Sequence, residues 1–408
     1  MLWNGENGVL TNCNFTNNHI NLNNVDNINF VGGGAVYWNG TSGNLNNCIF
    51  ISNFLNITGA DLGDIGGGAV YWNGTSGNLN NCIFMDNYCS VNGLNLSYRG
   101  GGAVYWNGID GILTESVFTN NYATATSHIS GGGIYWSVNA SNGKVFDCNF
   151  SGNYANYGGA GIYWDGSNGT IKSSNFINNT VDGYGGGSGV IISILSNNSF
   201  ISECNFINNT AHNYSGGAVR WLGPNGILIK SNFTGNSANN YGGAVEWGGA
   251  NGNLIDSIFI NNSALESGGG VNWGGANGNL SDSYFISNNA TTNGGAINWW
   301  AANGILINST FNSNSGTYGG AIAWGTTNGT IINSTFINNI ANNNGGAIVW
   351  YGDNCTMSNS TFTGNSANNV GGAVYWPGAN SDMNDCNFTN NNATYGDNVY
   401  WKWTVKDF

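Results

Sequence analysis

Residues 242–268 read GGAVEWGGANGNLIDSIFINNSALESG, and the pattern of these residues recurs along the whole chain. The opening motif, Gly-Gly-Ala-Val-x-Trp, places a tryptophan at regular steps. Six of these steps cover the 155 residues from Trp221 to Trp376, which is a period of about 26. In most copies a Phe follows the Trp by twelve residues, and an Asn follows that Phe by three, as Asn262 follows Phe259. Such a repeat predicts a solenoid.

Each coil of the repeat predicts three short strands. The slot of Val245 is Val or Ile in nearly every copy, whereas the slot of Glu246 varies widely, so the two point inward and outward on one strand. Leu254 marks a second strand, and residues 257–259 form a third, in which the first and last side chains point inward. Asn262 is expected to end the coil at a turn, because Asn tolerates the left-handed conformation.

When each slot stacks on the same slot of the next coil, the result is an all-β parallel β-helix, a solenoid of about fourteen coils. We predict a single domain over residues 1–408. Coils up to about residue 135 carry longer segments before the Trp strand, which predicts loop insertions there. Residues 395–408 are a possible C-terminal cap. The chain starts in mid-coil at Trp3, and we interpret it as a fragment or short member without an N-terminal cap.

The composition excludes several classes of protein. With 67 Gly, 81 Asn and only 2 Pro in 408 residues, neither a helical bundle nor collagen is expected. The chain has 7 Lys+Arg against 20 Asp+Glu, a net charge of −13, which argues against a nucleic-acid partner. The longest apolar stretch, residues 190–195, is too short to span a membrane. No metal-type Cys pair occurs, so no metal and no cofactor are predicted.

The pairing of Gly-Gly-Ala-[Ile/Val] with Phe-x-x-Asn resembles the repeat of the chlamydial polymorphic outer membrane proteins. The Asn-rich, Trp-marked form is still more similar to the adhesin-like surface proteins of methanogenic archaea. The resemblance covers nearly the whole chain, residues 3–401. It implies a right-handed β-helix, an extracellular or cell-surface location, and attachment to glycans or proteins of other cells. The resulting expectation is a non-enzymatic, secreted surface adhesin.

A stripe of tyrosines is the predicted binding face. Tyr37, Tyr71, Tyr105, Tyr135 and Tyr163 occupy one outward slot on five successive coils. Tyrosine is a good strand residue that stacks on itself, so the stripe is explained by strand structure alone. Exposed, aligned aromatic side chains are also typical of interfaces, and we expect this stripe to bind glycans or a partner protein. The Trp column shares the parity of the inward Val and is expected in the core.

Two other functions remain open. One is a polysaccharide lyase or hydrolase, because β-helices host such enzymes and neighbouring carboxylates serve their chemistry. Its candidate residues, the column of Glu203, Lys230, Asp256 and Asp282, lie at a strand corner, so no catalytic residue is predicted. The other is a purely structural surface stalk, which is favoured if the protein's own loops cover the tyrosine stripe.

Six of the eight cysteines lie two residues before a repeat Phe. This slot is otherwise Ser, which predicts a small inward position that accepts a thiol or a hydroxyl. Cys13, Cys48 and Cys82 fall in consecutive coils, so disulfides between coils are the alternative.

Overall fold

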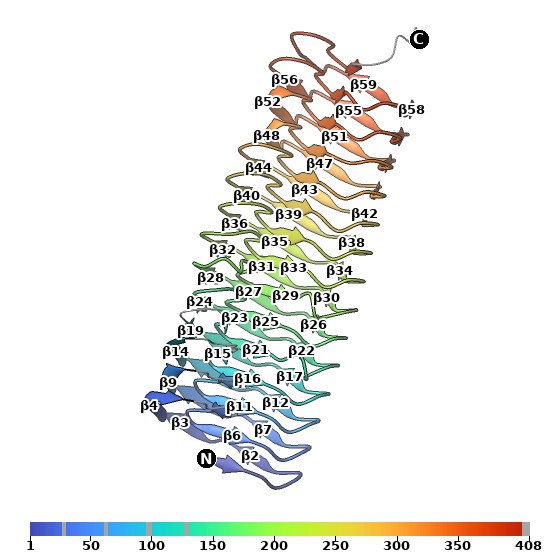
Figure 1. Ribbon diagram of the computed structural model, residues 1–408. Helices are drawn as coiled ribbons and strands as arrows, with labels where there is room; N and C mark the ends of the chain where they lie inside the picture. The colour runs from blue at the N-terminus through green and yellow to red at the C-terminus, as the bar shows by residue number, and fades with distance from the viewer. Residues whose placement is uncertain (27–29, 61–63, 95–99, 126–129, 402–408) are drawn as a thin grey trace. The chain divides into compact units, whose positions relative to one another are not determined.

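The computed structural model describes residues 1–26, 30–60, 64–94, 100–125 and 130–401, and its secondary structure there consists of β-strands (Figure 1). Parts of the predicted insertions, and residues 402–408 of the possible cap, lie outside the described residues. The chain divides into two compact units. Unit 1 comprises residues 1–214 and 218–223, and unit 2 comprises residues 215–217 and 224–408.

Unit 1 is built from four parallel sheets, each of which takes one strand from each coil. The first sheet contains β1 (Leu2–Trp3), β6 (Val36–Trp38), β11 (Val70–Trp72), β16 (Val104–Trp106), β21 (Ile134–Trp136), β25 (Ile162–Trp164), β29 (Val190–Ile192) and β33 (Val219–Trp221). The second contains β2 (Val9–Thr11), β7 (Asn44–Asn46), β12 (Asn78–Asn80), β17 (Ile112–Thr114), β22 (Lys144–Phe146), β26 (Thr170–Lys172) and β30 (Phe200–Ser202). The third contains β3 (Asn14–Thr16), β8 (Ile49–Ile51), β13 (Ile83–Met85), β18 (Val117–Thr119), β23 (Asn149–Ser151), β27 (Asn175–Ile177) and β31 (Asn205–Ile207). The fourth contains β4 (His19–Asp26), β9 (Phe54–Ala60), β14 (Tyr88–Leu94), β19 (Tyr122–Ala125), β24 (Tyr154–Ala155), β28 (Thr180–Val181) and β32 (Thr210–Ala211).

Unit 2 repeats this arrangement. Its first sheet contains β37 (Val245–Trp247), β41 (Val271–Trp273), β45 (Ile297–Trp299), β49 (Ile322–Trp324), β53 (Ile348–Trp350), β57 (Val374–Trp376) and β60 (Val399–Trp401). The second contains β34 (Ile227–Ile229), β38 (Asn253–Ile255), β42 (Asn279–Ser281), β46 (Ile305–Ile307), β50 (Thr330–Ile332), β54 (Thr356–Ser358) and β58 (Asp382–Asn384). The third contains β35 (Asn232–Thr234), β39 (Ile258–Ile260), β43 (Tyr284–Ile286), β47 (Thr310–Asn312), β51 (Thr335–Ile337), β55 (Thr361–Thr363) and β59 (Asn387–Thr389). The fourth contains β36 (Ser237–Ala238), β40 (Ser263–Ala264), β44 (Asn289–Ala290), β48 (Ser315–Tyr318), β52 (Ile340–Asn344) and β56 (Ser366–Ala367).

The prediction of a parallel β-helix is confirmed, and each coil adds a fourth short strand to the three that the sequence predicts. Strands pair slot on slot, as Val245 pairs with Val271 and Trp247 with Trp273. The inward side chains of a coil, such as Leu254 and Phe259, are fully buried. Successive indole and phenyl rings stack about one coil apart, with 4.8 Å between the ring centroids of Trp247 and Trp273. The prediction that the Trp column lies in the core is therefore confirmed.

The Asn of each Phe-x-x-Asn motif lies inside the coil, and this differs from the prediction that it ends the coil at a turn. Asn262 is fully buried, and the turn residue in the left-handed conformation is its neighbour Asn261, with φ of 54°. The buried amides form a ladder: Asn262 Nδ2 donates to Asn288 Oδ1 in the next coil at 3.0 Å and to Phe233 O at 3.0 Å. A buried polar group must be hydrogen bonded, and here each coil satisfies its neighbour.

The turn after most first-sheet strands packs against the buried indole of that coil. A Cβ atom at Gly278 would lie 2.3 Å from Nε1 of Trp273, so only glycine fits while the ring keeps its place. Cys355 occupies the equivalent position one residue before β54, and there the rings of Trp324 and Trp350 are inclined by 24°. Elsewhere in the column adjacent rings are nearly parallel, as for Trp299 and Trp324 at 3°.

We therefore expect Gly278→Ala to lower the free energy of unfolding of unit 2 by about 1–3 kcal/mol, because the indole must tilt away from the new methyl group. The matched control is Cys355→Gly, which removes a side chain from the same slot and is expected to lower the free energy of unfolding by a smaller amount. Urea denaturation of both variants measures the difference. Equal stability of Gly278→Ala and the wild type would show that the indole moves freely.

Candidate functional site

The five predicted tyrosines do lie in one column, on β6, β11, β16, β21 and β25, but they are not an exposed platform. Tyr71, Tyr105, Tyr135 and Tyr163 are buried, with 0, 1, 0 and 7% of their surface exposed, and Tyr37 is half-buried. Their rings pack on one another, with centroids 4.6 Å apart for Tyr71 and Tyr105. The prediction that this stripe is exposed is therefore wrong for four of its five members.

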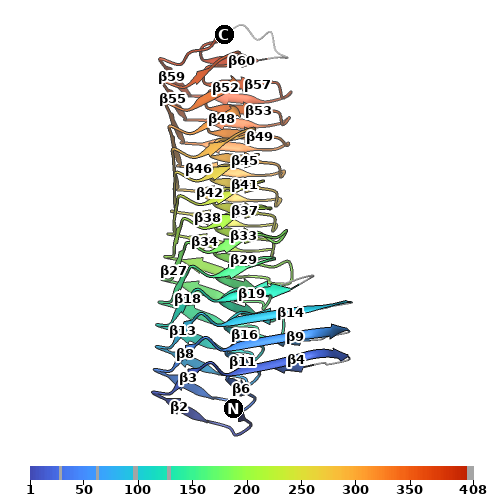
Figure 2. The same ribbon diagram turned by 90° about the vertical axis from the view of Figure 1, so that its left-hand side faces the viewer.

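The insertions of unit 1 account for this burial. They lengthen the fourth-sheet strands β4, β9 and β14, which extend beyond the other strands in Figure 2. They also add two small parallel sheets, β5 (Phe30–Gly32) with β10 (Asp64–Gly66), and β15 (Gly100–Gly101) with β20 (Ser130–Gly131). A Cβ atom at Gly32 would lie 2.1 Å from Cδ2 of Tyr71, and one at Gly66 would lie 2.6 Å from Cδ2 of Tyr105. Strands β5 and β10 therefore lie directly against the rings of Tyr71 and Tyr105.

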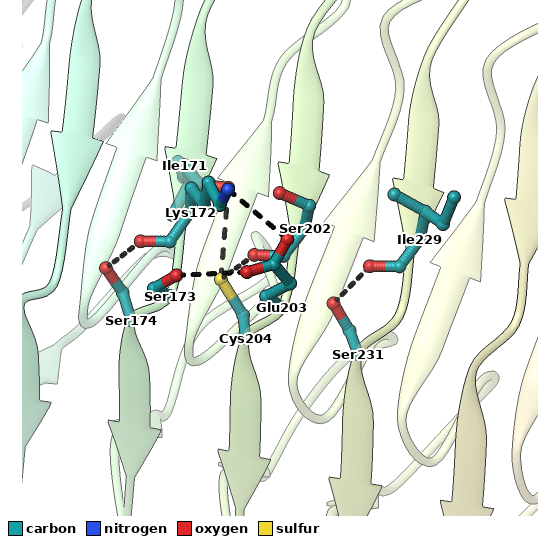
Figure 3. Close-up of polar contacts among 9 residues, drawn as sticks. All are labelled: Ile171, Lys172, Ser173, Ser174, Ser202, Glu203, Cys204, Ile229 and Ser231. Carbon is teal, nitrogen blue, oxygen red and sulfur yellow. Dashed lines mark hydrogen bonds and ion pairs between the residues drawn. The ribbon is translucent and has the colours of Figure 1, made fainter.

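The acidic column at the strand corner is exposed to solvent. Glu203 pairs with Lys172 at 3.3 Å, and both side chains are nearly half exposed (Figure 3). Asp256 and Asp282 are exposed, and each adopts the left-handed conformation, with φ of 49° and 54°. This corner position selects residues that accept positive φ, most often Asn, so the carboxylates belong to a turn.

The Cys/Ser slot is a small, inward, hydrogen-bonding position. Figure 3 shows the common contact: the hydroxyl of Ser174 donates to Lys172 O at 2.9 Å, and the thiol of Cys204 donates to Ser202 O at 3.2 Å. Burial raises the pKa of the Cys204 thiol to about 12, so the group stays protonated and unreactive. Cys13, Cys48 and Cys82 are likewise thiols, and the alternative of disulfides between them is not observed.

A groove of about 460 Å³ lies on unit 2, in the region that corresponds to the covered tyrosines of unit 1. Its floor comes from the same outward slot of the first sheet, which holds Glu246 on β37, Asn272 on β41 and Asn298 on β45. One wall comes from the segment before that sheet, where Tyr241, Ser267 and Asn293 pair in register. The remaining lining residues are Glu266, Thr292 and Trp300.

The floor of the groove is a hydrogen-bonded polar ladder. Asn272 Nδ2 donates to Glu246 Oε2 at 2.9 Å, and Asn298 Nδ2 donates to Asn272 Oδ1 at 2.6 Å. The next residue in register is Ala323, whose side chain has no donor. Within the part of the chain that the structure describes, Asn298 Oδ1 has no hydrogen-bond partner, although Asn298 is only 1% exposed. An unpaired buried acceptor is costly and calls for an explanation.

Two aromatic side chains flank this polar floor. Trp300 is 53% exposed and Tyr241 is 40% exposed, although large aromatic side chains usually bury most of their surface. The indole of Trp300 lies over the next coil, where a Cβ atom at Gly325 would be 2.8 Å from Cε3 of Trp300. The absence of a side chain at Gly325 therefore fixes where this ring lies. Aromatic faces beside a row of polar groups are suited to an elongated polyhydroxylated ligand.

The predicted tyrosines and the floor of the groove occupy the same outward slot of the coil, but they lie in different coils. The prediction from sequence singles out Tyr71 and its stacked neighbours, whereas the open groove lies where this slot changes to Glu246, Asn272 and Asn298. Two signals are present in the sequence: that change of residue type, and the Trp299-Trp300 doublet, which adds an indole outside the buried column.

Residues 359–375 match the family profile of the Chlamydia polymorphic membrane protein repeat. This stretch contains Phe362 to Asn365 and the Gly371-Gly372-Ala373-Val374 motif, so both halves of the repeat are present and the resemblance to that repeat is confirmed. The similarity to archaeal adhesin-like proteins stays a prediction. The comparison with curated proteins found no match.

Two solved structures have a similar fold. One is the A-module of mannuronan C-5 epimerase AlgE4 from Azotobacter vinelandii, with 10% identity and a TM-score of 0.37, over 91% of this chain and 91% of that one. The other is the Agl-KA catalytic domain, with 15% identity and a TM-score of 0.37, over 86% of this chain and 62% of that one.

The prediction of a non-enzymatic protein is contradicted here, because both of these structures come from enzymes, an epimerase module and a catalytic domain. The carboxylates that the sequence singles out lie in the exposed acidic column, whereas Glu246 and Glu266 line the groove. The match to a membrane-protein repeat indicates a location at a cell surface or outer membrane. In the described part of the chain, no helix is long and apolar enough to cross a bilayer.

Proposed function

We propose that this chain is a surface β-helix that attaches to glycans of other cells, and that the groove of unit 2 is its attachment site. The observation that carries the proposal is the combination of two exposed aromatic rings, Trp300 and Tyr241, with a polar floor in one groove. Sugars present both C–H faces, which pack on aromatic rings, and hydroxyl groups, which hydrogen bond to amides and carboxylates. The confirmed repeat of a membrane-protein family supports a surface role.

The direction of the groove supports a chain-like ligand. Glu246, Asn272 and Asn298 come from three successive coils of unit 2, so equivalent polar groups repeat at the spacing of parallel strands, about 4.8 Å. A pyranose ring linked through opposite positions advances by a similar length. Consecutive sugars of a linear glycan can therefore meet consecutive coils.

We expect Trp300→Ala to weaken glycan binding about ten- to thirtyfold, because exposed aromatic anchors at binding sites each contribute about 2 kcal/mol. A glycan array, followed by calorimetry on the best ligand, measures the effect. The matched control is Tyr284→Ala on β43, which removes an aromatic ring that is 50% exposed in a different sheet of unit 2. Equal binding by both variants and the wild type would exclude the groove, and absence of glycan binding by the wild type would exclude the function.

Action on the bound glycan is a second candidate, because Glu246 and Glu266 line the same groove and paired carboxylates catalyse glycoside cleavage. Product analysis on the same glycan samples tests it. New reducing ends that disappear in Glu266→Gln would establish an enzyme. An unchanged glycan would leave attachment as the remaining proposed function.

A further inference from the structure

We infer that the groove of unit 2 selects glycans that carry free amino groups and rejects glycans that carry carboxylates or sulfates. The inference rests on the proposed function, and it adds the chemical class of the ligand. Two carboxylic side chains, Glu246 and Glu266, line the groove, and neither Lys nor Arg is among its nine lining residues.

The floor of the groove also favours a ligand that donates hydrogen bonds. One N–H of Asn272 and one of Asn298 are used within the ladder, on Glu246 Oε2 and on Asn272 Oδ1. Among the described residues, Asn298 Oδ1 is an acceptor without a donor, and only 1% of the surface of Asn298 is exposed. A ligand that brings a donor to this position can satisfy the acceptor, whereas a ligand that brings only acceptors leaves it unpaired. Hydroxyl and ammonium groups are donors, whereas carboxylates and sulfates are acceptors only.

Glu266 sets the charge preference at the rim. It lies in the segment between β40 and β41, is exposed to solvent, and lines the groove beside Ser267. A protonated amine near this carboxylate gains a charge-assisted hydrogen bond. A uronate or sulfate in the same place meets a like charge, on a chain whose net charge is already −13. Because the rim is solvated, the gain is that of an exposed ion pair, which corresponds to about two- to fivefold in affinity.

The experiment compares three probes of equal length and linkage: a β-1,4-linked glucosamine oligomer, the corresponding glucose oligomer and a β-1,4-linked uronate oligomer. Affinities for the full chain are measured by calorimetry at a mildly acidic pH, at which amines are protonated and carboxylates are ionised. We expect the affinity to be highest for glucosamine, intermediate for glucose and lowest for the uronate. Added salt should narrow the differences.

The variant Glu266→Gln should reduce the ratio of glucosamine to glucose affinity about two- to fivefold. Asp382→Asn is the matched control, because it removes the same charge from exposed strand β58 of unit 2 outside the groove lining, and it should keep the ratio. Equal affinities for the three probes, tightest binding of the uronate, or an unchanged ratio in Glu266→Gln would overturn this inference while leaving attachment intact. Binding of none of the three, together with an empty glycan array, would instead remove the proposed function itself.

Discussion

Asn288→Ala is expected to lower the free energy of unfolding of unit 2 by about 3–6 kcal/mol, because the four hydrogen bonds of its buried side-chain amide are lost at once and each contributes about 0.5–1.5 kcal/mol. One of the four runs from Asn288 Nδ2 to Asn314 Oδ1 at 3.0 Å. Asn288 Oδ1 accepts from the backbone N of Asn262 at 3.1 Å and from its Nδ2 at 3.0 Å. Asn288 Nδ2 donates to Phe259 O at 3.0 Å. The interior is closed to water at this position, so no solvent molecule replaces the lost amide.

Hydrogen exchange followed by mass spectrometry locates the effect. Peptides that cover β39 and β43 should lose protection in Asn288→Ala. The matched control is Asn261→Gly, one residue before the buried Asn262. Asn261 is exposed with φ of 54°, and Gly235 and Gly364 already occupy the equivalent turn with φ of 66°. This variant should change stability by a few tenths of a kcal/mol. If the two variants were equally stable, the amide ladder would contribute nothing.

The sequence predicts the inward columns well, because their residue type is constrained in every coil. Val245, Leu254, Phe259 and Trp247 are all fully buried, as their slots predict. The error at Asn262 has a specific cause: two consecutive asparagines end the third strand, and both a left-handed turn and a buried amide ladder favour Asn. Only contacts between coils decide which of the two points inward.

The candidate site was harder to predict, because exposure depends on what covers a sheet and not on strand parity. Parity correctly places Tyr105 and Asn298 on the outer face of the first sheet. In unit 1 that face is covered by strands β5 and β10, whose packing does not follow from the repeat. In unit 2 the connecting segment is shorter and the slot is polar, which leaves the groove. Asp256 carries a carboxylate, as many catalytic residues do. It occupies this corner because the turn there requires a residue that accepts positive φ.

Tyr105→Ala is the second variant for which we expect a large effect, a loss of about 3–5 kcal/mol in the stability of unit 1, as for other buried aromatic residues. The ring is 1% exposed and lies between the rings of Tyr71 at 4.6 Å and Tyr135 at 5.2 Å. Its outer face meets Gly66 of β10, so its removal opens a cavity between the first sheet and the covering strand.

Hydrogen exchange in β10, β11, β16 and β21, measured together with glycan binding, decides what the tyrosine column does. Tyr122→Ala is the matched control, because that ring also stacks on one neighbour, at 4.7 Å from Tyr154, but is 41% exposed and should cost about 1 kcal/mol or less. A buried column requires that Tyr105→Ala lose protection in these strands. If the tyrosines instead formed an exposed binding platform, Tyr105→Ala would keep its protection against hydrogen exchange and would lose glycan binding. That result would move the attachment site from the groove at Trp300 back to the tyrosines.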